Sequence, residues 1–181
     1  EVLADHAVLA IPFTLLREVE MDVDLPPLRR RAIAELGYGT HAKIMAGFRE
    51  RSWRARGSGG DVFTDLPFQC SWEASRLQEG RAGILANLSG GRHGLEVGSG
   101  PAAARAQEFV DGLDRVFPGA GDAYDRRAVR MHWPTYQWTR GSHASYRVGQ
   151  ATAFGGRESE RAGNIHFCGE HTSAAARGSM E

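Results

Sequence analysis

The chain has 181 residues, enough for one domain with a core of its own or for pieces of two domains. Its 22 basic and 22 acidic side chains balance, so no net charge favours nucleic acid or an anionic membrane as a partner. No apolar run approaches the roughly 20 residues that a membrane-spanning helix needs. No signal sequence is visible either, which favours a cytoplasmic location without establishing one.

The strand and helix patterns begin near the N-terminus. Residues 6–12 form a continuous apolar run closed by Pro12, which predicts a short strand buried on both faces. A proline pair then precedes apolar residues at helical spacing, and Gly37 and Gly39 follow, so we expect a helix over residues 28–36. The stretch THAKIMAGF alternates apolar and other residues, which predicts a strand with Lys43 on its less apolar face.

The remaining elements continue a mixed pattern. Strand candidates lie between residues 61 and 91, and apolar residues at helical spacing predict a helix over residues 101–117. We expect a strand at residues 127–134, a turn and loop at 140–150, and a last strand at 163–168. The sequence therefore predicts a mixed α/β fold without internal repeats.

Both ends of the sequence look cut. The chain starts at Glu1 without an initiator Met, directly on a strand-like run, and it stops shortly after what reads as a helix N-terminus. We therefore expect a fragment of a longer protein. Its two cysteines, Cys70 and Cys168, lack His or Cys partners at metal-ligand spacing, so we expect two free, buried thiols and no metal site.

The glycine motif after Val97 is weak evidence for a nucleotide site. Gly98-x-Gly100-x-x-Ala103 follows a short apolar run and precedes a helix, as in dinucleotide-binding loops. The apolar run is only three residues long, and no following strand ends in an acid that could hold a ribose. We interpret the motif as a plain loop before a helix. A serine-hydrolase elbow is absent from the sequence, and His166 and His171 have no common metal-ligand spacing.

The stretch NIHFCGEHTS offers a more coherent site. A strand that delivers Gly169-Glu170 at its carboxyl end places a carboxylate where open α/β sheets bind ligands, and a carboxylate accepts hydrogen bonds from sugar hydroxyls. Small residues then lead to Gly178, where a helix N-terminus would point N–H groups at an electron-rich ligand atom. The alternative is a capped helix after an ordinary strand.

Lysine is almost absent from the chain. Of the 22 basic residues 21 are Arg, and Lys43 is the only Lys. A compact ammonium cannot be replaced by a planar guanidinium at every site, so the single lysine is a candidate functional residue.

Four stretches carry more information together than any of them alone, namely DHAVLAIPFTLLREV, the strand with Lys43, MHWPTYQWTRGSHASYRVGQATAF and NIHFCGEHTSAAARGSME. In this order they resemble the flavin-containing amine oxidases, the family of monoamine, polyamine and L-amino-acid oxidases. The likeness is collinear over nearly the whole chain and corresponds to the C-terminal part of the family. It implies a segment of a Rossmann-like FAD-binding domain at residues 1–20 and 141–181. It also implies a substrate domain, with a mixed sheet flanked by helices, at residues 21–140.

The resemblance also implies roles for particular residues. Lys43 would hold a water next to flavin N5, and Glu170 would accept hydrogen bonds from the ribityl hydroxyls. The resemblance further implies a cofactor-binding set, which consists of Gly169, Glu170, Gly178, Ser179, Met180, Trp133 and Trp138. His143 and Ser179 stand where relatives often place an aromatic pair against the substrate. Ser142 stands where covalent flavoproteins of the family carry a cysteine, so we expect non-covalent FAD.

The implied reaction is the FAD-dependent oxidation of an amine or L-amino acid to an imine, with O2 reduced to hydrogen peroxide. The sequence does not decide between the two substrate classes, and a homodimer is also compatible with the family. The glycine loop that would bind the ADP part of FAD is missing. The alternative is therefore an inactive remnant, or a subunit that contributes only part of a flavin site.

Overall fold

The computed structural model describes residues 2–179, which fall into two compact units. Unit 1 comprises Glu1–Gly39 and Pro134–Glu181, and unit 2 comprises Thr40–Trp133. From the sequence we expected the domain boundaries near residues 20 and 140. In the structure, residues 21–39 and 134–140 pack with unit 1, so the chain passes between the units at residues 39/40 and 133/134.

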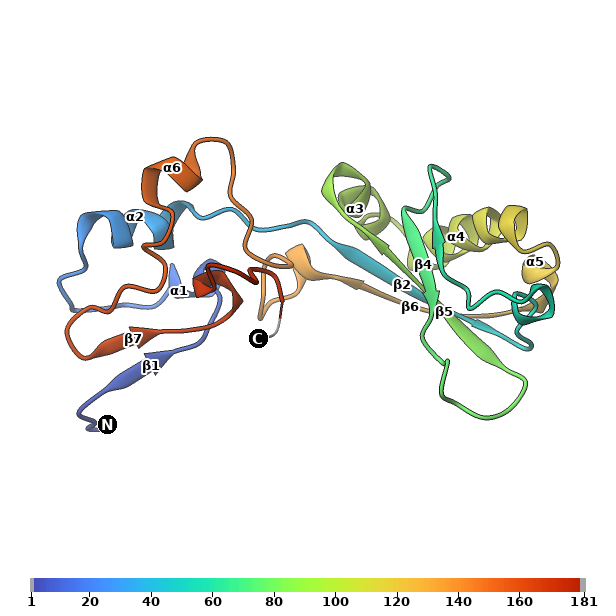
Figure 1. The fold of residues 1–181 in the computed structure, drawn as a ribbon, viewed down its shortest axis with the longest axis horizontal. Helices are drawn as coiled ribbons and strands as arrows, with labels where there is room; N and C mark the ends of the chain where they lie inside the picture. Colours follow the sequence, from blue (N-terminus) through green and yellow to red (C-terminus); the bar gives the residue numbers. More distant parts are fainter. Residues whose placement is uncertain (1, 180–181) are drawn as a thin grey trace. The chain divides into compact units, whose positions relative to one another are not determined.

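Unit 2 is built on a five-stranded antiparallel sheet with strand order β3-β4-β5-β2-β6 (Figure 1). The strands are β2 (Ala42–Phe48), β3 (Val62–Phe63), β4 (Cys70–Glu73), β5 (Gly83–Ser89) and β6 (Tyr124–His132). The helices are α3 (Gly91–Gly98), α4 (Ala102–Val116) and α5 (Ala120–Ala123). The 3-10 turn η1 (Arg54–Arg56) lies between β2 and β3, and η2 (Trp133–Thr135) follows β6 at the end of the unit. The helix predicted at 101–117 and the strand predicted at 40–48 are confirmed. The strand predicted at 127–134 is present but runs from Tyr124 to His132, and Trp133 and Pro134 belong to η2.

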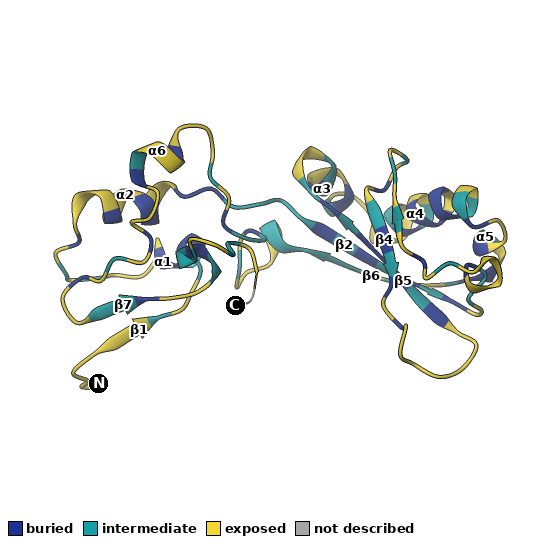
Figure 2. Cartoon of the chain, viewed as in Figure 1, coloured by how far each residue is buried: buried dark blue, intermediate teal, exposed yellow. Residues whose placement is uncertain are grey.

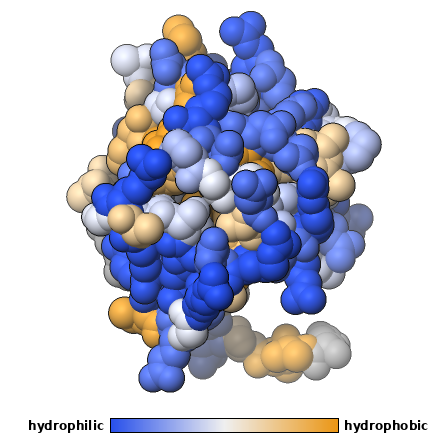
Figure 3. Space-filling model, turned by 90° about the vertical axis from the view of Figure 1, so that its right-hand side faces the viewer, coloured by the Kyte–Doolittle hydropathy of each residue, from blue (hydrophilic) through white to orange (hydrophobic). Residues whose placement is uncertain are grey.

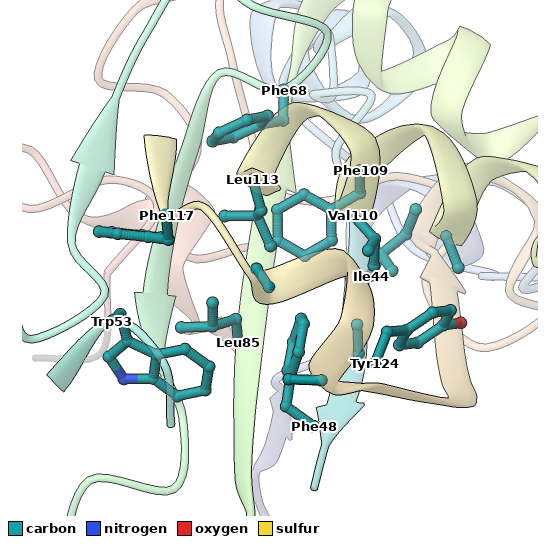
Figure 4. Packing of buried hydrophobic residues seen from close by; sticks show 14 of the residues in the cluster. Ile44, Phe48, Trp53, Phe68, Leu85, Phe109, Val110, Leu113, Phe117 and Tyr124 are labelled. Carbon is teal, nitrogen blue, oxygen red and sulfur yellow. The ribbon is translucent and has the colours of Figure 1, made fainter. Parts of the chain in front are cut away.

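Strand β2 fixes which side of the sheet forms the core. Ala42, Ile44, Ala46 and Phe48 are each at most 1 % exposed, whereas the residues between them are half-buried. The buried side packs against α4 through Phe109, Val110 and Leu113, with Phe48 and Trp53 in edge-to-face contact (Figure 4). Because successive strand residues point to opposite faces, this packing assigns Lys43 to the other face.

Helix α3 replaces the short strand that the glycine motif seemed to require. Leu95 to Val97 belong to its last turn, so the motif joins two helices rather than a strand and a helix. A Cβ on Gly98 would lie 2.4 Å from a ring atom of His132, which explains this glycine by packing. Gly100 has φ +67°, a left-handed conformation that favours glycine at the turn. The interpretation as a plain loop holds, with a structural reason for each glycine.

Unit 1 contains a two-stranded parallel sheet of β1 (Ala7–Leu9) and β7 (Ile165–Phe167), in which Ala7 pairs with Ile165 and Leu9 with Phe167. Its helices are α1 (Phe13–Leu16), α2 (Pro27–Glu35) and α6 (Gln150–Phe154), and a 3-10 turn η3 (Glu170–Thr172) follows β7. Its core gathers apolar residues from these elements, among them Phe13, Leu36 and Phe154. Helices α1 and α6 were not predicted, because each is at most five residues long.

Two burial predictions for unit 1 are wrong. Strand β1 is not buried on both faces: Ala7 and Val8 are exposed, Val8 to 65 %, and Leu9 is half-buried. Figure 2 shows β1 mostly in the colour of exposed residues. Cys168 is exposed as well, since it follows the end of β7, while Cys70 is half-buried in β4. Both thiols are free, as expected. Between residues 2 and 179, no helix combines the length and apolar character of a membrane span.

Candidate functional site

Lys43 lies on the face of the unit 2 sheet that α3 and α4 do not cover. Its cross-strand neighbours are Leu88 of β5 and Met131 of β6, so an ammonium group stands on a face with apolar neighbours. The sequence predicted that Lys43 lies on the less apolar face of its strand. This is true of β2 by itself, but the neighbouring strands place apolar side chains on the same face of the sheet. Among the described residues, the Lys43 ammonium has no carboxylate within ion-pair distance.

Two indole rings, rather than a carboxylate, lie close to the Lys43 ammonium group. Nζ of Lys43 lies 5.1 Å from the ring centroid of Trp72 and 5.7 Å from that of Trp133. Both distances are within the range of cation–π attraction, worth about 0.5–2 kcal/mol depending on desolvation. Trp133 follows β6 directly and donates its backbone N–H to the carbonyl of His41, which continues the β2–β6 pairing by one residue. The ammonium is therefore placed by sheet geometry.

Trp72 was not predicted from the sequence. It lies on β4, paired with Ala86, which is in turn paired with Met45 two residues from Lys43. The available signal was the alternation in β4, where Ser71 and Glu73 are buried and Trp72 points to the opposite face. That signal becomes readable only once the order of strands β4, β5 and β2 is known.

A cavity of about 400 Å³ opens farther along unit 2, toward the other end of β2. Met45, Ile84 and Val129 supply part of its apolar lining, and the carboxylates of Glu79 and Asp125 are among its polar lining groups. Gly47 leaves room for Asp125, since a Cβ on Gly47 would lie 2.9 Å from both carboxylate oxygens. Arg127 also lines this cavity, so this part of unit 2 combines apolar surface with two carboxylates and one guanidinium.

Glu170 is the central polar side chain of unit 1. It follows β7 in η3, and its Oε1 accepts a hydrogen bond from the backbone N–H of Ala144 at 2.8 Å. Its Oε2 accepts another from the backbone N–H of Gly178 at 2.9 Å. Gly169 precedes it with φ +116°, which lets the chain turn sharply after the strand. One carboxylate thereby joins its own turn to the segment at Ala144, 26 residues earlier, and to Gly178, eight residues later.

His143 and Gly178 are neighbours in this arrangement. A Cβ on Gly178, which has φ +84°, would lie 3.3 Å from ring atoms of His143. The ring Nδ1 of His143 lies 3.1 Å from the carbonyl oxygen of Ala144. The structure therefore brings together four of the residues singled out from the sequence: His143, Gly169, Glu170 and Gly178.

The segment that carries His143 is held by residues 37–39. Gly39 donates to the carbonyl of His143 at 2.8 Å, and Ser145 donates to the carbonyl of Gly37 at 2.8 Å. A Cβ on Gly37 would lie 2.4 Å from the carbonyl oxygen of Ser145, so this close approach requires glycine. Gly37 and Gly39 were interpreted only as a helix stop, and the structure gives them this second role.

Buried titratable groups support the same region. Tyr38 accepts a hydrogen bond from the backbone N–H of Phe13, and burial raises the pKa of Tyr38 to about 12. His171 packs on the ring of Phe13 at 4.3 Å, and burial lowers the pKa of His171, which favours the neutral ring. Tyr146 donates to the buried carboxylate of Glu158, and burial followed by this hydrogen bond raises the pKa of Tyr146.

Arg177 ties the last described turn to this support. Its guanidinium donates to the hydroxyl of Tyr146 at 2.7 Å and stacks on that ring at 3.8 Å from the centroid. It also lies 3.4 Å from the carboxylate of Glu158. The C-terminal end of residues 173–178 is thus held by two neighbouring contacts, the Arg177 side chain with Tyr146 and Glu158 and the Gly178 amide with Glu170.

The remaining predicted residues are less closely connected. Ser179 is exposed, and its N–H donates to the carbonyl of Ala176 at 3.0 Å. The helix expected near Gly178 has not begun by Ser179, and Met180 lies outside the described residues. Trp138 belongs to unit 1 and is 64 % exposed, whereas Trp133 belongs to unit 2. No group of His, Cys, Asp or Glu within residues 2–179 has the arrangement of a metal site.

Comparison with known proteins places the chain in a class of flavoenzymes. The sequence profile of the family described as flavin containing amine oxidoreductase matches all of residues 1–181. The chain belongs to this family, whose members use FAD. The resemblance drawn from the sequence is confirmed, and so is the mixed α/β fold.

Particular relatives show how much of such a protein the chain represents. It is 30 % identical over 175 residues to the protein named "Putative L-amino-acid oxidase YobN" of Bacillus subtilis (strain 168), covering 94 % of this chain and 37 % of the relative. It is 24 % identical to "Amine oxidase [flavin-containing]" of Danio rerio, covering 98 % and 35 %. The structure of cyclohexylamine oxidase from Brevibacterium oxydans IH-35A superposes with a TM-score of 0.83 at 20 % identity, covering 93 % and 37 %. The chain thus spans little more than a third of these proteins.

The Glu170 carboxylate yields a stability prediction. In Glu170→Gln only one side-chain oxygen remains, and an amide group faces a backbone N–H, so one charge-assisted hydrogen bond is replaced by repulsion. We expect unit 1 to lose about 1–3 kcal/mol of stability, with faster hydrogen exchange at the amides of Ala144 and Gly178.

The matched control is Glu160→Gln, which removes a carboxylate from the ion pair with Arg157 in the same unit. Surface pairs contribute about 0–1 kcal/mol, so this variant should exchange like the parent chain. Equal exchange rates in both variants would show that Glu170 does not clamp the three segments.

Proposed function

We propose that this chain supplies part of the active site of a flavin-dependent oxidase acting on amines or L-amino acids. The observation that carries the proposal is the match of the amine oxidoreductase family to every residue of the chain, in which the only lysine stands on an open sheet face between two indoles. The fold superposition and the order of Lys43, Trp133 and Glu170 along the sequence support it.

The donor and acceptor groups present fit an FAD molecule. The Glu170 carboxylate uses one acceptor position on each oxygen for backbone N–H groups and keeps further lone pairs for sugar-alcohol hydroxyls. Gly169, Gly178 and Ser179 add no bulk beside it, so a ligand can approach the backbone closely. Met180, Trp133 and Trp138 complete the proposed cofactor-binding set. The hydroxyl at Ser142 cannot form a thioether, so we expect the cofactor to be held without a covalent bond.

FAD, when bound, supplies the two-electron oxidation of a neutral amine to an imine and passes the electrons to O2, which gives hydrogen peroxide. The chain's own residues would bind the cofactor, orient it and tune the charge around it. Lys43 would hold a water through its N–H donors and stabilise negative charge that develops as electrons reach O2. A bound cofactor that covered this open face would exclude bulk water from the ammonium, and its charge would then act more strongly.

The substrate side of the proposal rests on His143 and Ser179. A polar ring and a small hydroxyl at these positions would leave a less enclosed pocket than an aromatic pair, and would accept a polar substituent next to the amine. Amines and L-amino acids both fit this description. A peroxide-coupled screen of the whole protein against both classes would separate them.

Substitution of Lys43 tests the proposed role in the reaction with O2. In the whole protein, Lys43→Met keeps the side-chain length and removes the charge, so electrons should reach O2 at least about tenfold more slowly, because one electrostatic contact worth about 1.4 kcal/mol or more is lost. Stopped-flow recovery of the oxidised flavin absorbance measures this rate.

Two comparisons keep that test specific. Lys43→Arg retains the charge in a forked shape and should fall between the parent and Lys43→Met. The rate of anaerobic flavin reduction by substrate should change less than the rate of recovery with O2. An unchanged recovery rate in Lys43→Met would remove the proposed role.

A second candidate is that these residues alone form an incomplete flavin site. It is favoured because this chain covers 37 % or less of the length of each curated relative that it matches. If it holds, the purified 181-residue chain should be colourless and make no peroxide, because no glycine loop for the ADP part of FAD is present. A yellow preparation with flavin absorbance after gel filtration would contradict this candidate and favour binding by the chain itself.

A further inference from the structure

The end of unit 2 that carries α5 presents mostly hydrophilic side chains (Figure 3). A cavity of about 790 Å³ lies there between η1, the loop around Gly80 and the turn at Pro118–Gly119. Four arginines line it, namely Arg51, Arg54, Arg56 and Arg81, and Glu50 is the acidic side chain among the lining residues. In a chain of zero net charge, this is a local concentration of positive charge.

A buried carboxylate holds two of these arginines in place. The Glu73 side chain is 1 % exposed and accepts a hydrogen bond from Nε1 of Trp53 at 2.8 Å. Arg54 binds it with two nitrogens, at 2.8 and 3.0 Å, and Nε of Arg51 lies 3.0 Å from it. Burial alone would raise the pKa of Glu73, but the hydrogen bonds from Trp53, Arg54 and Ser75 outweigh it and lower that pKa. The carboxylate therefore stays charged at neutral pH.

Arg51 also shapes the far wall of the cavity. Its guanidinium donates to the carbonyls of Gly80, Gln78 and Ser75 at 2.7, 2.9 and 3.2 Å. Arg54 donates to the carbonyl of Arg76 at 3.1 Å. The walls are thus preorganised by hydrogen bonds within unit 2, so a ligand would not have to order them.

The other two arginines retain donors for a ligand. Within the described part of the chain, the Arg56 guanidinium makes no hydrogen bond or ion pair with another side chain. Arg81 is 83 % exposed and pairs through one nitrogen with Glu50, which leaves its other N–H groups available. Even with Glu73 counted beneath the cavity, the positive groups outnumber the negative ones by two.

We propose that this cavity binds a small soluble molecule carrying a diphosphate. Arginine N–H groups bind phosphate oxygens in pairs, and the free donors come from two separate segments, η1 and the loop at residues 80–82. An anion with two charged groups can contact both segments, whereas a single carboxylate can neutralise only one. The site lies wholly in unit 2 and involves neither Lys43 nor Glu170.

Titration with inorganic pyrophosphate at constant ionic strength tests the proposal. We expect saturable binding, with amide chemical-shift changes at residues 54–57 and 80–82. The double variant Arg56→Gln with Arg81→Gln should bind at least about tenfold more weakly, because two charge-assisted contacts are lost. Glu50→Gln should bind several-fold more tightly, since it releases Arg81.

The matched control is Arg92→Gln with Arg115→Gln, which removes the same charge from exposed positions on α3 and α4 outside the cavity. It should change the affinity less than about twofold. Equal weakening in both double variants would show nonspecific charge attraction and overturn the proposal. Absence of saturation, or shift changes confined to unit 1, would overturn it as well.

Discussion

The pairing of β2 on both of its edges is the constraint on which unit 2 depends. Its seven residues are matched one by one to β5 and, apart from an irregularity near Phe48, to β6. This register places four side chains in the core and Lys43 on the open face. A slip of one residue would bury the ammonium and expose Ile44 and Phe48, so the core holds the lysine in position.

In unit 1 a single carboxylate has a comparable effect. Glu170 contacts backbone amides of residues 144 and 178, and the segment around residue 144 is itself paired with residues 37–39. Arg177, which precedes Gly178, attaches the same turn to Tyr146 and Glu158. A group proposed to contact a ribityl chain is therefore also a structural element, and its replacement would change both binding and local stability.

The elements with clear periodicity could be predicted from the sequence. The alternation in β2 and the helical spacing in α4 gave the correct type and nearly the correct bounds. Helix α3 could not be predicted, because its last turn, Leu95 to Val97, is a short apolar run that suits a strand equally well. The exposure of Val8 was missed because an apolar run shows only that a segment prefers burial, not that other strands cover it.

The residues of the candidate sites also differ in how far the sequence could predict them. Glu170 and Gly178 were identified from the strand end and the small residues that follow it, and His143 by resemblance to a family. The structure brings them together through backbone hydrogen bonds and close contacts that no sequence pattern encodes. Trp72 was missed because its position near Lys43 depends on two intervening strand pairings. The arginine cluster of the unit 2 cavity was missed for a similar reason, since Arg81 joins Arg51, Arg54 and Arg56 only in the folded unit.

The most direct measurement exploits the fact that Lys43 is the only lysine. In a chain labelled with 13C- and 15N-lysine, one set of side-chain signals reports on this residue alone. The structure predicts upfield shifts of the Lys43 methylene protons from ring currents, and nuclear Overhauser contacts to the indoles of both Trp72 and Trp133. Shifts typical of a solvent-exposed lysine, without contacts to either indole, would contradict the placement on which the proposed chemistry rests.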